Sequence, residues 1–325
     1  MVTLDEIRQA QQRIQGVAVR TPLIPCPHGD PDRRLYFKAE NLQPIGAFKI
    51  RGAYNKIASL PEDERRRGVI TYSSGNHAQG VAYAARALGI KAVVVMPNNA
   101  PKTKIEATRA LGAEVVFVGP ASSERQQKAE ELAAKHGYQM IPPYNDEKII
   151  AGQGTIGLEI LEDLPDVGCV LSPVSGGGLL SGIATAIKLS RPEVKVIGCE
   201  PELAADAQES LRTGKLVTWP AEKTTRTICD GLRTQSLGAI NYEHVRRYVD
   251  DIVTVSEDEV REAMRRMALN AHLVAEPSGA VTFAAFLFHA DEFPKATATV
   301  AVVSGGNVEA ELLAEVLAAG IPSAV

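Results

Sequence analysis

The stretch GAFKIRGA, residues 46–53, places a lysine and an arginine between two glycines. Lys49 is compatible with three roles there: a solvated loop cation, a phosphate ligand or a nucleophile. A lysine acts as a nucleophile only when part of it is uncharged, and an apolar or cation-bearing pocket lowers its pKa for this purpose. Because glycines leave the backbone permissive, this stretch alone does not decide among the three roles.

The sharpest local pattern is the run Ser175-Gly176-Gly177-Gly178, which follows an apolar strand-like segment and precedes a helical one. In such a run the backbone N–H groups point into one concavity, and the helix N-terminus adds roughly half a positive charge. The run is a candidate phosphate site, although glycine-rich turns also occur for structural reasons alone. It lacks the GK[ST] of a Walker loop and the G-x-G-x-x-G of a dinucleotide site. We therefore expect a small phosphorylated cofactor.

Two further polar loops follow strand-like segments. Ser73, Ser74, Asn76 and His77 lie between a predicted strand and a predicted helix. Ligands collect at such strand ends in open α/β folds, and hydroxyls, an amide and a helix N-terminus suit a carboxylate. A plain N-cap cluster is the alternative. In AVVSGGN, Ser304 would present a neutral hydroxyl at a strand end, which suits the ring nitrogen of a heteroaromatic cofactor.

Short β-branched runs alternate with helical patterns along the chain and must position these loops. The strand-like runs are GVITYS, KAVVVMP, AEVVFVG, VGCVLSPV, VKVIGCE and TATVAVVS. Nearly continuous apolar strands separated by helices of about ten or more residues are typical of parallel sheets covered on both faces, so we predict an α/β fold. The run MIPPYNDEKIIAGQG breaks this alternation and predicts a domain crossing near residues 141–150.

Composition excludes several classes of protein. The 325 residues suffice for one large or two modest domains, and 45% apolar with 23% charged residues is ordinary for a soluble globular protein. A net charge of −4 gives no reason to expect a nucleic-acid partner. The 4 cysteines form no CxxC pair, which argues against a zinc cluster and for reduced thiols. Without a signal peptide or an apolar run of ~18 residues, we expect a cytoplasmic protein with no membrane partner.

Four motifs occur in order along the chain: Lys49 in GAFKIRG, the SSGNH loop, the SGGGL loop and the terminal SGGN. With this order and spacing, the sequence resembles the fold-type II pyridoxal-phosphate enzymes of the threonine/serine dehydratase and serine racemase family. The resemblance covers nearly the whole chain. It implies a two-domain fold like that of the tryptophan synthase β subunit, with a mainly parallel sheet in each domain. The large cofactor-binding domain would comprise residues 1–45 and 146–325, and a small substrate-clamping domain residues 46–145.

By this resemblance the cofactor is pyridoxal 5′-phosphate. Lys49 would bind its aldehyde covalently and later remove the Cα proton of the substrate. Phe48 would pack on the cofactor ring, Asn76 would hydrogen-bond the ring hydroxyl, and Ser304 would meet the ring nitrogen. N–H groups of four consecutive residues would hold the phosphate: Gly176, Gly177, Gly178 and Leu179. A serine partner leaves the ring nitrogen uncharged, which weakens the electron sink and favours elimination and racemisation over transamination.

The resemblance implies a threonine/serine ammonia-lyase, which converts a β-hydroxy amino acid to a 2-oxo acid and ammonia. Ser73, Ser74, Asn76 and His77 would hold the substrate carboxylate. Many threonine dehydratases have alanine at the position of Ser74, whereas in serine racemases a serine there returns a proton to Cα on the face opposite the lysine. Ser74 is thus a second catalytic candidate, and serine racemase, an isomerase, is the alternative. Arg125 aligns with an arginine that reaches a second carboxylate, which keeps 3-hydroxyaspartate ammonia-lyase open; a helix-surface arginine is the other interpretation.

The segment GCEPELAADA matches the divalent cation site of racemase-type relatives. Glu200 and Asp206, with the main-chain carbonyl of Ala204, would bind Mg²⁺ or Ca²⁺, which prefer oxygen ligands. Two solvated acids in a loop are the alternative. Because relatives are commonly dimers or tetramers, the resemblance also implies a homo-oligomer. The small-molecule partner that it implies is the substrate, a β-hydroxy amino acid.

Overall fold

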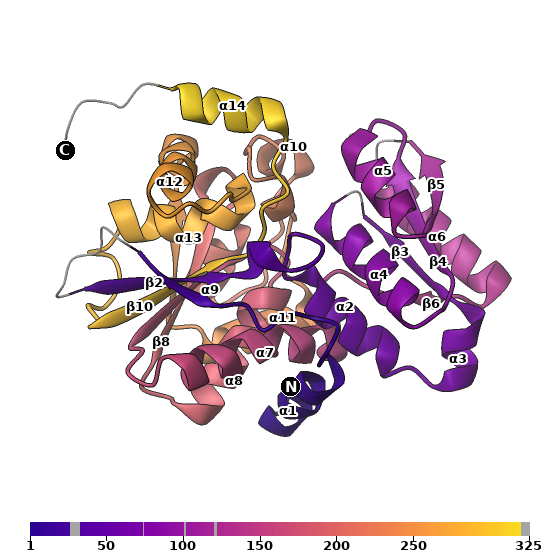
Figure 1. The fold of residues 1–325 in the computed structure, drawn as a ribbon, viewed down its shortest axis with the longest axis horizontal. Helices are drawn as coiled ribbons and strands as arrows, with labels where there is room; N and C mark the ends of the chain where they lie inside the picture. The colour runs from indigo at the N-terminus through magenta and orange to yellow at the C-terminus, as the bar shows by residue number, and fades with distance from the viewer. Residues whose placement is uncertain (27–32, 74, 101, 120–121, 320–325) are drawn as a thin grey trace.

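The computed structural model describes residues 1–26, 33–73, 75–100, 102–119 and 122–319. Two sheets lie side by side, the six-stranded sheet to the left and the four-stranded sheet to the right in Figure 1, and helices cover both faces of each. Each sheet with its helices is called the six-stranded part or the four-stranded part below. This arrangement confirms the predicted α/β class.

The six-stranded sheet has the order β1-β2-β10-β7-β8-β9, antiparallel between β1 and β2 and parallel elsewhere. Its strands are β1 Leu23–Pro25, β2 Arg34–Ala39, β7 Cys169–Pro173, β8 Lys195–Pro201, β9 Asp251–Val255 and β10 Ala298–Val303. Successive side chains on a strand point to opposite faces. On β10, Ala301 and Val303 therefore enter one core, and Val300 and Val302 enter the other.

Two groups of helices close these two cores (Figure 1). One face carries α12 Glu257–Asn270, α13 Pro277–Phe288 and, against α12, α14 Ala310–Ala318. The other carries α7 Glu147–Asp163, α8 Gly178–Ser190, α11 Ala239–Tyr248 and α1 Leu4–Arg13. The shorter elements of this part are η1 Glu40–Leu42, η2 Glu202–Ala204, α9 Asp206–Thr213, α10 Ala221–Thr224 and η3 Asp230–Leu232.

The four-stranded sheet has the order β5-β4-β3-β6 and is parallel throughout. Its strands are β3 Val69–Tyr72, β4 Ala92–Pro97, β5 Glu114–Val118 and β6 Gln139–Met140. The central strand β4 is buried on both faces, because α4 covers one and α6 the other. The helices of this part are α3 Glu62–Arg67, α4 Asn76–Ala87, α5 Lys102–Ala110 and α6 Ser122–His136.

Helix α2, Lys49–Ala58, packs against α4 of the four-stranded part and against α7 of the six-stranded part. Its approach to α7 requires glycine. A Cβ atom on Gly152 would lie 2.6 Å from the Cα atom of Gly52, closer than side chains approach in folded proteins. The element that begins with Lys49 is therefore fixed between the two parts.

A fully buried ion cluster, formed by Lys38, Glu40, Arg51 and Glu159, anchors the first turn of α2. The guanidinium group of Arg51 donates to both carboxylate oxygens of Glu40, each at 2.8 Å, and to those of Glu159 at 2.7 and 2.8 Å. Lys38 donates to Glu159 at 2.6 Å. Two cations thus match two carboxylates, and the cluster ties β2, η1 and α7 to α2.

The predicted crossing near residues 141–150 covers the link between β6 and α7 and the first turn of α7. The domain boundaries at 45–46 and 145–146 stay predictions. Among the described residues, no helix is both long enough and apolar enough to span a bilayer.

Candidate active site

Lys49 is the first residue of α2, and its side chain is half-buried. The Nζ atom donates to the carbonyl oxygen of Pro143 at 2.9 Å and lies 5.1 Å from the centre of the Phe48 ring. Burial lowers the pKa of Lys49 from 10.5 to about 8, with the nearby Glu276 carboxylate acting in the opposite direction. In a fraction of the molecules the Lys49 amine is therefore uncharged near neutral pH, as a lysine nucleophile requires.

The end of β10 lies against the residues that precede α2. The N–H of Phe48 donates to the carbonyl oxygen of Ser304 at 3.0 Å, and Ala47 forms an isolated antiparallel bridge with Gly305. The side chain of Ser304 is buried, and its Oγ donates to the carbonyl oxygen of Ser278 at 3.3 Å. These bonds bring Lys49 and Ser304, which lie near opposite ends of the chain, into one site.

Asn76, the first residue of α4, lies in a hydrogen-bonded chain beside this strand end. Its Nδ2 donates to Oε1 of Glu276 at 2.7 Å, and its Oδ1 accepts from Nδ2 of Asn307 at 2.8 Å. Asn307 also donates to the carbonyl oxygen of Ile45 at 2.9 Å. The chain of bonds therefore joins the SSGNH and SGGN motifs.

Glu276 is a candidate site residue that the sequence reasoning missed. It precedes α13, whose first residue is Pro277, and an acid before a helix reads as an ordinary N-cap. The structure buries it instead, and burial, with the Asp230 carboxylate second, raises the pKa of Glu276 from 4.5 to about 8. Because its bond to Asn76 joins residues 200 positions apart, no local pattern could have identified it.

The glycine run forms the turn between β7 and α8. Gly177 is the N-cap of α8 and has a φ of 94°, which favours glycine. A Cβ atom on Gly176 would clash with the ring of Tyr144, so glycine is what allows this ring to lie against the loop backbone. Gly178 and Leu179 then begin α8, a helix of 13 residues whose free N–H groups and dipole attract an anion.

The Pro143–Tyr144 dipeptide connects the lysine to the glycine run. Pro143 accepts the hydrogen bond from Lys49, and the ring of Tyr144 lies against Gly176. The described residues thus combine a partly uncharged amine, a glycine loop at a helix N-terminus, the buried hydroxyl of Ser304 and the half-buried amide of Asn76. This donor set fits pyridoxal phosphate, although the roles of the individual residues stay predictions.

The residues predicted to hold the substrate carboxylate are only partly placed. Ser73 Oγ accepts from the N–H of Gly75 at 3.3 Å, and His77 Nε2 donates to the carbonyl oxygen of Ile141 at 2.9 Å. Burial, with the Lys49 charge second, lowers the pKa of His77 from 6.5 to about 3, so His77 is neutral. Ser74 lies outside the described residues. Arg125 is half-buried on α6, and burial lowers its pKa.

The predicted cation ligands Glu200, Ala204 and Asp206 lie together where β8 meets η2 and α9, and all three are buried. Oε1 and Oε2 of Glu200 accept from the N–H groups of Ala207 and Gln208 at 3.2 and 3.0 Å. Oδ2 of Asp206 is buried and has no hydrogen-bond partner among the described residues. Burial raises the pKa of both carboxyls, and Asp206 adds to the rise at Glu200.

These two carboxylates fit a divalent cation, because an unpartnered buried oxygen needs a positive ligand. The described residues contain no group of three or more His, Cys, Asp or Glu side chains that could hold a metal ion. The two carboxyl groups therefore have no third ligand side chain of these types beside them in that part of the chain.

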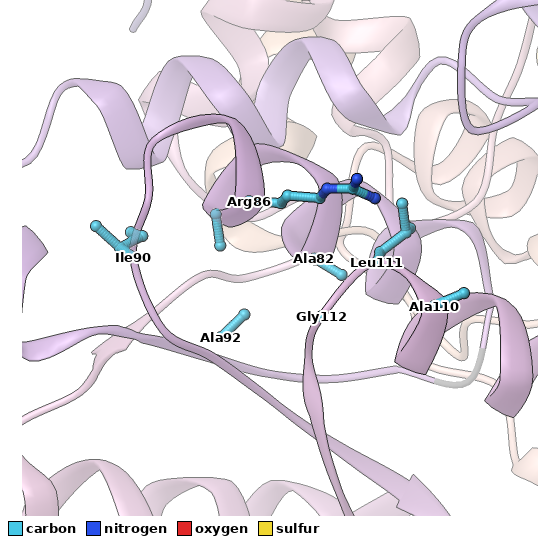
Figure 2. Close-up of a pocket in the computed structure, with 8 residues that line it drawn as sticks. Ala82, Arg86, Ile90, Ala92, Ala110, Leu111 and Gly112 are labelled. Carbon is cyan, nitrogen blue, oxygen red and sulfur yellow. The ribbon is translucent and has the colours of Figure 1, made fainter.

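A pocket of about 300 Å³ lies elsewhere in the four-stranded part (Figure 2). It is lined by Ala82, Ala85, Arg86, Ile90, Ala92, Ala110, Leu111 and Gly112. Arg86 lies near the C-terminal end of α4, whereas Asn76 begins that helix, and at ~1.5 Å per residue the two are roughly 15 Å apart. The pocket is therefore not part of the candidate site.

Comparisons with known proteins confirm the family resemblance that the sequence motifs predicted. The family model described as pyridoxal-phosphate dependent enzyme matches residues 14–305. An L-threonine ammonia-lyase of Thermotoga maritima is 45% identical, with 99% of this chain and 79% of the relative covered. A catabolic L-threonine dehydratase of Escherichia coli is 43% identical, with 97% and 96% covered. The solved structure of maize serine racemase has a TM-score of 0.92 at 37% identity, with 97% and 96% covered.

Proposed function

The chain belongs to the family of pyridoxal-phosphate-dependent enzymes, and we propose that it is a threonine/serine ammonia-lyase. It would release the β-hydroxyl of L-threonine or L-serine as water, and hydrolysis of the resulting enamine, which consumes one water, would give a 2-oxo acid and ammonia. The observation that carries the proposal is the half-buried Lys49, whose lowered pKa leaves a fraction of its amine uncharged, beside Ser304 and the glycine run. The names of the two bacterial relatives support the same reaction.

Bound pyridoxal phosphate supplies an electron sink for negative charge at the substrate Cα. Lys49 would hold the cofactor and then take the Cα proton, which an uncharged amine can accept. Asn76 would donate to the ring hydroxyl, Ser304 would meet the ring nitrogen without protonating it, and Phe48 would cover the ring. Backbone N–H groups would bind the phosphate: those of Gly176, Gly177, Gly178 and Leu179. Ser73 and Ser74, with Asn76 and His77, would surround the substrate carboxylate.

The test compares Lys49→Ala with Lys56→Ala, a matched control because Lys56 lies on the same helix and pairs with Asp146 near the surface. After incubation with pyridoxal phosphate, the wild type and Lys56→Ala should show the visible absorbance of the covalently held cofactor and form 2-oxo acid from L-threonine. Lys49→Ala should show neither. A colourless wild type, or turnover by Lys49→Ala, would contradict the proposal.

Serine racemase is the second candidate, and Ser74 together with the similarity to maize serine racemase favours it. Ser74 would return a proton to Cα from the face opposite Lys49. Ser74→Ala should then suppress D-serine formation and spare 2-oxo acid formation from L-serine, measured in one reaction. Equal loss of both products would remove this role. The third candidate activity is that of a 3-hydroxyaspartate ammonia-lyase. Arg125→Ala, assayed with L-threo-3-hydroxyaspartate, tests it, because this substrate has a second carboxylate and threonine and serine do not.

We also propose a divalent cation bound by Glu200, Asp206 and the carbonyl oxygen of Ala204, supported by the unpartnered oxygen of Asp206. A homo-oligomer is proposed from the resemblance alone. Sedimentation equilibrium measures its mass directly, and a monomer at micromolar concentration would reject it.

A further inference from the structure

An ion pair connects the two parts of the molecule beside the candidate site. Lys104 lies on α5 of the four-stranded part, Asp230 begins η3 of the six-stranded part, and Nζ of Lys104 contacts Oδ2 of Asp230. The Lys104 side chain is 14% exposed and that of Asp230 is 39% exposed. The pair is therefore partly exposed to water.

The six-stranded end of this pair leads directly to the site. Gly231, next to Asp230, donates its N–H to Oγ of Ser278 at 2.9 Å, and the carbonyl oxygen of Ser278 accepts from Ser304 at 3.3 Å. A Cβ atom on Gly231 would lie 4.0 Å from Oε1 of Glu276. The loop that carries Asp230 thus packs on the start of α13, where Glu276 lies.

The four-stranded end leads to the same place. Helix α5, which carries Lys104, packs against α4, and α4 begins with Asn76. Asn76 crosses to the six-stranded part through its bond to Glu276 at 2.7 Å. The two parts are therefore held together around Glu276 by the hydrogen bonds of Asn76 on α4 with Glu276 and Asn307, and by the ion pair from α5.

We propose that Lys104 and Asp230 are positioning residues for the reaction: their ion pair keeps the four-stranded part against η3, so that Asn76 stays on Glu276 beside Lys49. The kinetic consequences of this role rest on the proposed ammonia-lyase function. Because the pair is partly exposed, it is weak enough to break and re-form, and salt weakens it. Breaking it lowers the fraction of molecules with an assembled site. The apparent substrate affinity falls in proportion to that fraction.

The kinetic experiment uses Lys104→Met, Asp230→Asn, the double variant and the charge swap Lys104→Asp/Asp230→Lys. Each single change should raise the KM for L-threonine by about two- to fivefold and leave kcat nearly constant. The double variant should match the single ones, and the swap should restore most of the loss. Lys91→Met is the matched control, because Lys91 pairs with Glu114 at 2.8 Å within the four-stranded part; its KM should equal that of the wild type.

A second measurement does not depend on activity. Amide hydrogen exchange of the cofactor-loaded protein should be faster in α5 and η3 for Lys104→Met and Asp230→Asn, normal for Lys91→Met, and restored by the swap. Unchanged exchange in both single variants would overturn the proposal, as would a fall in kcat without a rise in KM. If the wild type turns over neither threonine nor serine, the proposed function has failed, and exchange still decides the role of the ion pair.

Discussion

Replacing Arg51 with methionine removes the centre of the buried ion cluster while keeping a long side chain in the first turn of α2. Arg51 is 0% exposed and donates to Glu40 and Glu159 at 2.7–2.8 Å. After the change, Lys38 still contacts Glu159 at 2.6 Å, whereas the donors that remain on Glu40 among the described residues are the uncharged Thr21 and Gln43. A buried carboxylate without a cation results.

The magnitude follows from this uncompensated charge. Removing one partner of a buried ion pair costs about 3–5 kcal/mol, whereas an exposed pair contributes roughly 1 kcal/mol or less. Arg66 and Glu62 form such an exposed pair, with side chains 76% and 65% exposed, so Arg66→Met is the matched control. Since a folded protein is stable by about 5–15 kcal/mol, Arg51→Met should remove a large share of the total.

The assay is urea denaturation of the cofactor-free protein, followed by far-UV circular dichroism. Arg51→Met should lower the free energy of unfolding by about 3–5 kcal/mol and Arg66→Met by under about 1 kcal/mol. Adding Glu40→Gln to Arg51→Met should recover part of the loss, because the buried carboxylate is then neutral. Equal losses for the two arginine variants, or no recovery in the double variant, would refute the reasoning.

Three further predictions concern the site and its support. In cofactor-free protein, the folded state keeps the proton of Glu276 up to a pKa of about 8, against 4.5 when unfolded, so wild-type stability should fall as pH rises between these values; Glu276→Gln should lessen the fall, measured by urea denaturation at pH 5 and 9. Mg²⁺ or Ca²⁺ added to chelator-treated protein should raise the melting temperature, with about 2.7 kcal/mol of stabilisation at 100 times the dissociation constant, and Glu200→Gln should abolish the rise. Gly152→Ala should lower the free energy of unfolding by about 1–3 kcal/mol, because its Cβ would lie 2.6 Å from the Cα of Gly52; thermal denaturation measures this.

Local sequence patterns predicted those strands and turns whose conformation follows from residues adjacent in the sequence. The runs around β3, β4, β5, β7, β8 and β10 are apolar and β-branched, and each is followed by a helix in the structure. The sequence pattern did not predict β2, because it contains Lys38, a charged residue that the structure buries against Glu159 of α7. That compensation depends on two segments far apart in the chain.

The same distinction applies to the site. Lys49, Asn76, the glycine run and Ser304 stand in motifs with their own local signature, and the structure brings Lys49, Asn76 and Ser304 together through backbone and side-chain bonds. Glu276 has no such signature. Glu276 is a candidate because it is buried, accepts a hydrogen bond from Asn76 and has its pKa raised by burial and by Asp230. These contacts exist only in the folded chain.

The buried charges of this protein fall into two groups, according to how they are neutralised. In the buried ion cluster two cations match two carboxylates, so the low dielectric strengthens every contact and the cluster serves structure. Glu276 accepts from an amide, and one oxygen of Asp206 has no hydrogen-bond partner in the part of the chain that the structure describes; burial raises the pKa of both carboxyls. Carboxylates buried without a matched side-chain cation cost stability, and groups kept at such a cost concentrate at functional sites. Glu276 lies where the motifs predict a cofactor, and Asp206 lies where they predict a divalent cation. The search for buried carboxylates without a matched cation, which does not depend on motifs, therefore points to the same two places.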